Sequence, residues 1–205
     1  MAIVCLDLEG VLIPEIWIGL AELTGIDSLR ATTRDVPDYN ELMRQRLAIL
    51  DEHGLGMEDI QRVIADMRPM DGAYDFLMDI RSRHQVVILS DTFYQFAQPL
   101  MAQLDWPALF CHELRVEADG RISNFHIRLE DHKRRAVAAF RQLNFTTVAA
   151  GDSYNDTSML SEADRGILFR PPQRVIDDFP HFPVANDYPA LTDAVETAMA
   201  SVSPR

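Results

Sequence analysis

Along most of this chain, short apolar runs are followed by longer segments whose apolar residues recur at helical spacing. This pattern is typical of a parallel sheet whose strands are joined by helices. The apolar run Ala2 to Leu6 is typical of a strand buried on both faces. From Gly72 onward, strand-like runs follow segments whose apolar residues recur at helical spacing. Strands are predicted at 85–89, 109–111, 146–150 and 166–169, and helices at 73–82, 93–104, 133–143, 155–163 and 187–200. The fold class that follows is α/β, with a doubly wound, mostly parallel sheet and helices on both faces.

A long stretch after the first strand interrupts this pattern, because its apolar residues recur only at helical spacing. Pro14 and Pro69 mark the linkers on either side, since a residue that precedes a proline is disfavoured in a helix. We therefore expect residues 1–13 and 71–205 to form a Rossmann-like catalytic core. Residues 14–70 would form a small helical cap inserted after the first strand.

A β-hairpin is predicted within the core. Residues 113–117 and 121–127 alternate between apolar and polar positions, and Ala118-Asp119-Gly120 between them supplies turn residues. This pairing would be antiparallel in an otherwise parallel sheet.

The composition limits the size and the partners of the protein. The 205 residues, 47% of them hydrophobic, can bury one full core and a small second one. A formal charge of −13 argues against binding to nucleic-acid backbones, which needs clustered Lys and Arg. The same charge repels anionic substrates, so a phosphate ligand would have to be held by a metal or by a few placed cationic side chains.

The sequence also bears on location. No apolar run approaches the length of a membrane span, and the N-terminal apolar segment lacks the length and the basic flank of a signal peptide. Cys5 and Cys111 stand in apolar surroundings, which predicts buried, reduced thiols rather than a disulfide. We expect a cytoplasmic protein that contacts no membrane.

Acidic side chains stand at the ends of two predicted strands. Asp7 and Glu9 follow the first strand, and Asp152 and Asp156 follow the strand at 146–150. Because ligands of open α/β sheets bind outside the carboxyl ends of the strands, we expect these carboxylates to share one crevice. Such a cluster is costly unless a cation neutralises it, so it predicts a divalent metal.

Two further polar residues occupy matching positions, Ser90 after the strand at 85–89 and Lys133 at the start of a helix. Each alone has an ordinary interpretation, Ser90 as a turn or N-cap residue and Lys133 as one of several cations at a solvated helix start. The six His residues show no metal-ligand spacing. Only the four carboxylates, Ser90 and Lys133 taken together, at corresponding positions of the fold, indicate a catalytic site.

Two other classes of protein share parts of this set. A receiver-like signalling domain places its phospho-accepting Asp after a middle strand, whereas Asp7 follows the first strand, so that class is the less favoured alternative. A nucleotide-dependent kinase is disfavoured because the chain has neither a Gly-x-x-x-x-Gly-Lys loop nor a Gly-x-Gly-x-x-Gly fingerprint.

Four segments, taken in order, resemble the motifs of the haloacid dehalogenase superfamily of phosphoryl-transfer enzymes: Asp7-Leu8-Glu9-Gly10-Val11, Ser90-Asp91-Thr92, Lys133 and Gly151 to Asp156. With the early helical insertion they resemble the phosphoserine phosphatase family, and in particular those members that are also phosphoserine:homoserine phosphotransferases. The resemblance implies Mg²⁺-dependent phosphoryl transfer from L-phosphoserine to water or to homoserine. A phosphatase for another small phosphomonoester is the alternative.

The resemblance assigns roles to the carboxylates. Asp7 would be the nucleophile that forms an aspartyl-phosphate, and Glu9 would be the proton carrier. Mg²⁺ would be held by Asp7, the backbone carbonyl of Glu9 and Asp152, with Asp156 acting directly or through water.

The resemblance also assigns the groups around the phosphate. Lys133 and Ser90 would hold the oxygens of the transferring group, and Asn155 would brace one of these two residues. Simpler phosphoserine phosphatases carry Gly-Gly where this chain has Asp91 and Thr92. We hypothesise that these two side chains narrow the space near the acceptor and let homoserine compete with water.

In the cap, the resemblance implies that Glu15 pairs with the substrate ammonium, Arg46 grips the carboxylate and Tyr39 forms a wall of the pocket. Arg44 or Arg30 could take the place of Arg46. The expected partner is a small molecule and no nucleic acid. The oligomeric state stays open, a homodimer included.

Overall fold

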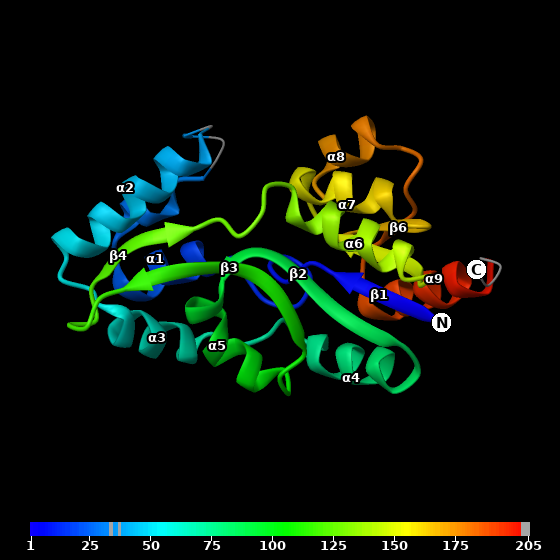
Figure 1. The fold of residues 1–205 in the computed structure, drawn as a ribbon, viewed down its shortest axis with the longest axis horizontal. Helices are drawn as coiled ribbons and strands as arrows, with labels where there is room; N and C mark the ends of the chain where they lie inside the picture. The colour runs from blue at the N-terminus through cyan, green and yellow to red at the C-terminus, as the bar shows by residue number, and fades with distance from the viewer. Residues whose placement is uncertain (33–34, 37, 202–205) are drawn as a thin grey trace.

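The computed structural model describes residues 1–32, 35–36 and 38–201, and within them seven strands form one sheet (Figure 1). The strand order is β4-β3-β2-β1-β5-β6-β7, and neighbouring strands are parallel except for β3 and β4. The strands are β1 (Ala2–Leu6), β2 (Gln85–Phe93), β3 (Ala108–Val116), β4 (Ile122–His126), β5 (Thr146–Gly151), β6 (Arg165–Phe169) and β7 (Val184–Ala185).

Helices lie on both faces of this sheet, with α6 and α7 on one side and α4 and α5 on the other (Figure 1). The α-helices are α1 (Ile16–Thr24), α2 (Tyr39–Glu52), α3 (Met57–Asp66), α4 (Ala73–Arg83), α5 (Tyr94–Gln103), α6 (His132–Gln142), α7 (Thr157–Glu162), α8 (Gln173–Asp178) and α9 (Tyr188–Ser201). Two short 3₁₀ helices are η1 (Asp27–Arg30) and η2 (Tyr154–Asp156).

The central strand β1 shows why helices cover both faces. Val4 and Leu6 belong to one buried apolar cluster, whereas Ile3 and Cys5 belong to a second. Successive side chains of a strand point to opposite faces, so the apolar run of β1 buries both sides of the sheet. The predicted α/β fold with a doubly wound, mostly parallel sheet is confirmed.

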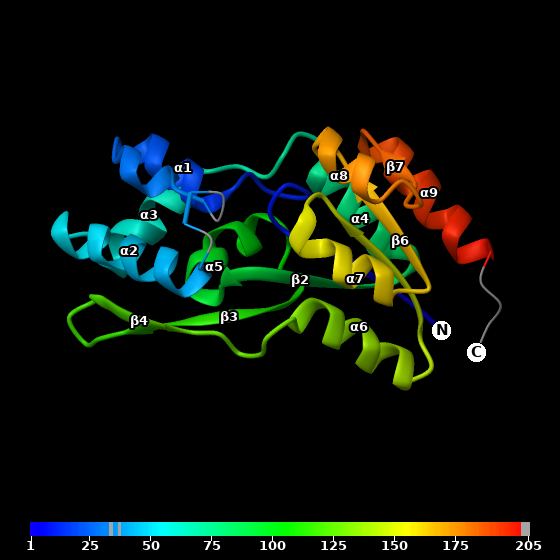
Figure 2. The same cartoon turned by 90° about the horizontal axis from the view of Figure 1, so that it is seen from above.

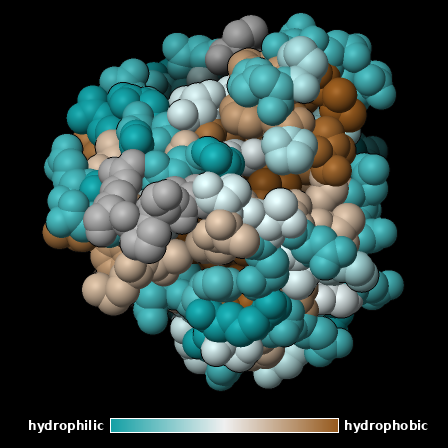
Figure 3. Space-filling model, turned by 90° about the vertical axis from the view of Figure 1, so that its right-hand side faces the viewer, coloured by the Kyte–Doolittle hydropathy of each residue, from teal (hydrophilic) through white to brown (hydrophobic). Residues whose placement is uncertain are grey.

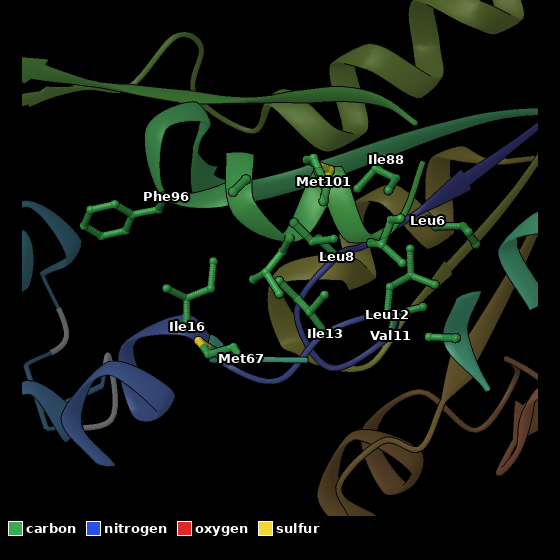
Figure 4. Close-up of a cluster of buried hydrophobic side chains, with 14 of the residues drawn as sticks. Leu6, Leu8, Val11, Leu12, Ile13, Ile16, Met67, Ile88, Phe96 and Met101 are labelled. Carbon is green, nitrogen blue, oxygen red and sulfur yellow. The ribbon is translucent and has the colours of Figure 1, made fainter. Parts of the chain in front are cut away.

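The segment between β1 and α4 leaves the sheet and forms α1, η1, α2 and α3, so its predicted helical character is confirmed. The backbone N–H of Met70 donates to the carbonyl of Leu12 over 2.9 Å, which brings the two linkers together. Ile16 and Met67, near the two ends of the insertion, lie in the same buried cluster as Ile13 (Figure 4). The inserted helices therefore pack on the core through a shared apolar cluster.

The predicted hairpin is formed by β3 and β4, which run beside α2 (Figure 2). Gly120 in its turn has a φ of +86°, a left-handed conformation that glycine adopts without strain. The Gly120 carbonyl accepts the N–H of Met57, the first residue of α3, over 2.8 Å. The hairpin tip thus joins the sheet to the inserted helices.

Several elements differ from the pattern. The strand predicted to end at Leu89 continues to Phe93, so Ser90 lies within β2, where pairing with β3 is irregular between Leu89 and Phe93. The segments at 109–111 and 113–117 form one strand, because β3 pairs with β2 and then with β4. Nothing in the pattern predicted α8 or β7, since six and two residues are too few to show a period.

The expectation for the two cysteines is confirmed, since Cys5 and Cys111 are buried free thiols. None of the helices within the described residues is long and apolar enough to cross a membrane.

Candidate active site

The carboxyl ends of β1, β2 and β5 meet at a cavity of about 670 Å³, which the inserted helices also line. The site residues predicted from the sequence gather here, because parallel strands end at the same edge of a sheet. Those that line the cavity are Asp7, Glu9, Glu15, Tyr39, Arg46, Ser90, Asp91, Thr92, Lys133, Asp152 and Asn155. Asp156 is fully buried and contacts Lys133 from behind this lining.

A second cavity, of about 570 Å³, lies where α7, β6 and α9 meet. Apolar side chains of Leu160, Ile167 and Phe182 contribute to its lining, and none of the predicted site residues does. Figure 3 shows this side of the molecule, where hydrophobic residues lie among hydrophilic ones. The first cavity is therefore the candidate active site.

Lys133 lies at the centre of the site and is 3% exposed. Its Nζ donates to Asp7 Oδ1 and to Asp156 Oδ1, each over 2.8 Å, and lies 3.2 Å from Asp91 Oδ2. An ammonium has three donors, and each of them meets a carboxylate. Burial alone would lower the pKa of Lys133, but the three carboxylates raise it well above its ordinary value, so the side chain stays charged.

Asp7, Asp152 and Asp156 bring carboxylate oxygens within 4.8 Å of one another. Burial and then the Asp156 charge raise the pKa of Asp7 well above its ordinary value, although Lys133 acts in the opposite direction. Burial and Asp156 also raise the pKa of Asp152 to about 7. Negative charge thus exceeds what one lysine can neutralise, and clustered oxygen donors of this kind suit a hard divalent cation.

The loop after β5 is held by its own carboxylate. Asp156 Oδ2 accepts the backbone N–H groups of Asp152 and Ser153 over 3.0 Å and 3.2 Å. Both Asp156 oxygens are then engaged, because Oδ1 accepts from Lys133. A Cβ at Gly151 would lie 2.4 Å from the Asp156 carboxyl carbon, so this close packing requires a glycine.

Glu9 connects the core to the inserted helices. Its Oε2 accepts the N–H of Ile16 over 2.9 Å, at the first turn of α1, where helix N–H groups lack intrahelical partners. Burial and the neighbouring carboxylate of Glu15 raise the pKa of Glu9 to about 8. Glu9 is therefore largely protonated at neutral pH and can donate a proton.

Ser90, Asp91 and Thr92 are held by hydrogen bonds that the sequence did not predict. The Ser90 hydroxyl is buried and accepts the N–H of Thr92 over 3.2 Å. Asn155 was expected to brace Lys133 or Ser90, but its Nδ2 donates to Asp91 Oδ2 over 2.8 Å. The reason is that Asp91 stands between the Asn155 amide and the lysine, so Asn155 acts on Lys133 only through Asp91.

Sequence analysis missed two residues beside Asp91. His132 Nε2 lies 3.1 Å and His112 Nε2 3.8 Å from Asp91 Oδ1, and both imidazoles are buried. The place of His132 directly before Lys133 was the one available signal. Nothing in the pattern around His112 marked it.

On the cap side, Arg46 is buried and its guanidinium lies 4.5 Å from the ring centre of Trp17. Its Nη2 donates to the Ala31 carbonyl over 2.9 Å, while its buried Nε has no hydrogen-bond partner within the described residues. Tyr39 donates from its hydroxyl to the Asp91 carbonyl over 3.3 Å. Arg46, which lines the cavity, therefore keeps one buried donor without a partner within the described residues.

The two alternative arginines point elsewhere. Arg44 is exposed and pairs with Glu41 over 2.6 Å, and Arg30 pairs with Glu22 over 3.2 Å. Neither side chain lines the cavity.

Known proteins are similar to this chain in sequence. Residues 16–161 match the model of the family described as haloacid dehalogenase-like hydrolase. The chain is 59% identical over 191 residues to "Phosphoserine phosphatase ThrH" of Pseudomonas aeruginosa, covering 93% of each protein. It is 58% identical to a phosphoserine phosphatase of Pseudomonas syringae pv. tomato, covering 92% of this chain and 80% of that protein.

Solved structures share the fold. A phosphoserine phosphatase in apo form superposes with a TM-score of 0.74 at 17% identity, covering 98% of this chain and 99% of that one. A phospho-aspartyl intermediate analogue of phosphoserine phosphatase gives a TM-score of 0.74 at 18% identity, with 96% and 98% covered.

Proposed function

Because the chain belongs to the haloacid dehalogenase-like hydrolase family, we propose that it transfers the phosphoryl group of L-phosphoserine, through an aspartyl-phosphate, to water or to homoserine. The relatives' names support the donor, and the name ThrH of the 59% identical relative is consistent with a homoserine acceptor. Membership of this family accounts for the clustered carboxylates, so we do not propose a receiver-like signalling domain.

One observation carries the proposal: the Asp7 carboxylate stands at the end of β1 with only its Oδ1 bound by Lys133. Oδ2 is then the oxygen that would attack phosphorus. The bond between phosphorus and the serine oxygen breaks, and the leaving oxygen takes the proton of Glu9. In the second half-reaction, ionised Glu9 takes a proton from water or the homoserine hydroxyl, whose oxygen attacks phosphorus as the bond to Asp7 breaks.

Lys133 and Ser90 would hold the oxygens of the transferring group. All three donors of Lys133 meet carboxylates here, so one of them must be shared with a phosphate oxygen. The 3.2 Å contact with Asp91 is longer than the two 2.8 Å bonds, so we expect this donor to be shared with the phosphate while Asp91 keeps the ammonium in place.

The clustered carboxylates fit Mg²⁺, with Asp7, Asp152 and the Glu9 carbonyl as direct ligands. Asp156, whose two oxygens already accept N–H groups, would act directly or through water. When bound, the ion would offset the negative charge of the site and of the phosphoryl group.

Residues 14–70 would act as the cap that selects the substrate. Arg46, with its unpartnered Nε, would bind the substrate carboxylate, Glu15 the ammonium, and Tyr39 would form a wall. The positions of Arg44 and Arg30 outside the cavity favour Arg46 over them. A cytoplasmic location stays a prediction, and the oligomeric state stays open.

Phosphorus NMR of the protein with L-phosphoserine, Mg²⁺ and excess homoserine tests the proposal. Phosphohomoserine would establish transfer to the alcohol, and free phosphate alone would establish a phosphatase. Phosphoserine that survives unchanged would contradict the donor, and a panel of other small phosphomonoesters would then identify the substrate.

A further inference from the structure

Two buried histidines from different elements converge on one carboxylate at the edge of the site. His112 belongs to β3 and His132 opens α6, and their ring centres lie 4.5 Å apart. Their Nε2 atoms face Asp91 Oδ1, at 3.8 Å from His112 and 3.1 Å from His132. The exposed fractions of the two residues are 3% and 2%, so neither interaction is exchanged freely with water.

The opposite nitrogens of the two rings identify their tautomers. The backbone N–H of Arg128 donates to His112 Nδ1 over 3.3 Å, and the Arg128 guanidinium Nη2 lies 3.4 Å from His132 Nδ1. A guanidinium can only donate, so His132 Nδ1, like His112 Nδ1, must accept. Each neutral ring then carries its proton on Nε2 and directs it at Asp91.

Neither imidazole adds a charge beside Asp91, because each ring accepts a hydrogen bond at Nδ1. Burial lowers the pKa of His132, although Asp91 acts in the opposite direction. Burial alone would raise the pKa of Asp91, but the Lys133 ammonium, the imidazole of His112 at 3.8 Å and hydrogen bonds from His132 and Asn155 hold it well below its ordinary range. Asp91 is therefore a fixed anion.

The two oxygens of Asp91 have separate partners. Oδ1 faces the two imidazoles, whereas Oδ2 accepts from Asn155 over 2.8 Å and lies 3.2 Å from Lys133 Nζ. The histidines thus orient the carboxylate so that its other oxygen meets the lysine. Without them Asp91 could rotate, and the third donor of Lys133 would lose its defined position.

We propose that His132, supported by His112 and Arg128, is a positioning residue that orients Asp91 and, through it, the Lys133 ammonium for phosphoryl transfer. The effect on turnover rests on the proposed function, whereas the tautomers and hydrogen bonds do not.

A metal ion is the competing explanation, because the three ligand atoms of Asp91, His112 and His132 lie within 4.8 Å of one another. A metal on Nε2 requires the proton on Nδ1, where both rings face donors from Arg128. The Lys133 ammonium, 3.2 Å from the same carboxylate, would also repel a dication. The structure favours hydrogen bonding.

The first experiment does not depend on activity. Long-range ¹H–¹⁵N spectra of the imidazoles in the full-length protein should show His112 and His132 as neutral Nε2–H tautomers at neutral pH. A protonated ring, or an Nδ1–H tautomer at either residue, would overturn the proposal. Stoichiometric binding of added Zn²⁺ that is lost in His132→Leu would overturn it as well.

The second experiment is a double-mutant cycle. His132→Leu should lower kcat for phosphoserine roughly 10- to 100-fold with a smaller change in KM, because a displaced lysine acts mainly in the transition state. His132→Gln should restore most of the loss, since its amide N–H can replace the Nε2 donor. Combined with Asp91→Asn, His132→Leu should cost nothing further, because both changes break the same interaction.

Independent, multiplicative losses from His132→Leu and Asp91→Asn would contradict an action through Asp91. So would wild-type kcat in a folded His132→Leu variant. If His132→Leu does not fold, Arg128→Met at an exposed position removes the guanidinium donor to His132, together with its hydrogen bond to the Cys111 carbonyl. It should still lower kcat several-fold and shift the His132 tautomer equilibrium. Unchanged kcat and tautomers in Arg128→Met would equally overturn the proposal.

His126→Leu, at an exposed position of β4, is the matched control and should leave kcat unchanged. A wild-type protein that leaves phosphoserine intact would refute the proposed function alone. The imidazole spectra would still decide whether the two histidines hold Asp91.

Discussion

Lys133 Nζ donates a hydrogen bond to Asp7 Oδ1 over 2.8 Å, although 126 residues separate the two in the chain. The pair is buried, at 3% exposure for each residue. Removing one member of a buried ion pair leaves an uncompensated charge, which is strongly destabilising. The folded state therefore keeps the two side chains together. The remaining Asp7 oxygen faces a site whose negative charge exceeds its positive charge, and the predictions below start from that imbalance.

Asp7→Asn should abolish turnover while the protein stays folded, because the amide oxygen can still accept from Lys133 but cannot attack phosphorus. We expect kcat to fall by at least about 10³-fold, and no phosphorylated protein should appear by intact-mass spectrometry. Asp75→Asn, an exposed change in α4, should have no effect. Full turnover in Asp7→Asn would contradict the role of Asp7 as the nucleophile.

The metal-free protein should lose stability as the pH rises. Glu9 and Asp152 have folded-state pKa values of about 8 and about 7, above the 4.5 and 3.8 of the free side chains. Between these pKa values the folded state therefore binds more protons than the unfolded state. The stability that Glu9 and Asp152 contribute is complete below the pKa values of the free side chains, and it is lost as the pH rises through the folded-state pKa values. Thermal unfolding in EDTA should show a falling Tm from about pH 5 to about pH 8.

Added Mg²⁺ should reduce this loss, because a bound cation favours ionised carboxylates. Binding near pH 6 should release a proton from Asp152, and apparent Mg²⁺ affinity should rise with pH. Calorimetry in two buffers of different ionisation enthalpy measures the released protons. A Tm in EDTA that rises over the same range would refute the raised pKa values.

Gly10→Ala should weaken metal binding, because a Cβ there would lie 2.5 Å from the Asp152 carboxyl carbon. Gly25→Ala is the matched control: the φ values are +78° and +71°, but nothing lies within 4 Å of a Cβ at Gly25. Both changes should cost about 1 kcal/mol of stability through backbone strain. Only Gly10→Ala should lower Mg²⁺ affinity, by about 10-fold or more, in a calorimetric titration. Equal losses of affinity in the two variants would refute the role of this close packing.

Arg46→Lys should lower kcat/KM for phosphoserine about 10- to 100-fold, since a lysine keeps the charge but loses the planar pair of donors. Phosphoethanolamine lacks the carboxylate, so its kcat/KM should change much less. Arg44→Lys, on the exposed side of α2, should leave both substrates unaffected. If both substrates lose activity equally in Arg46→Lys, the arginine does not bind the carboxylate.

Replacing Asp91-Thr92 by Gly-Gly should lower the proportion of phosphohomoserine among the products, because the space near the acceptor widens and water enters more easily. The product ratio by phosphorus NMR is the measurement, since the loss of Asp91 should also lower the total rate. Thr92→Ser keeps the hydroxyl and should preserve the ratio. An unchanged ratio in the Gly-Gly variant would show that acceptor choice is set elsewhere.

Local pattern was sufficient for the sheet and for the residues at its carboxyl edge. The apolar run of β1 predicted a strand buried on both faces, and the shared edge of parallel strands then predicted that Asp7, Ser90 and Asp152 lie together. These inferences succeed because hydrophobic periodicity is visible in short stretches of sequence, and because parallel strands end at the same edge of a sheet.

Tertiary packing decided the finer contacts. Asn155 binds Asp91, and His112 and His132 face the same carboxylate, because β3, α6 and the loop after β5 come together in three dimensions. Of the three arginines considered for the substrate carboxylate, Arg30, Arg44 and Arg46, only Arg46 packs against Trp17 and lines the cavity. No periodicity carries such information, because a side-chain contact between distant segments depends on the angle and depth at which their elements pack.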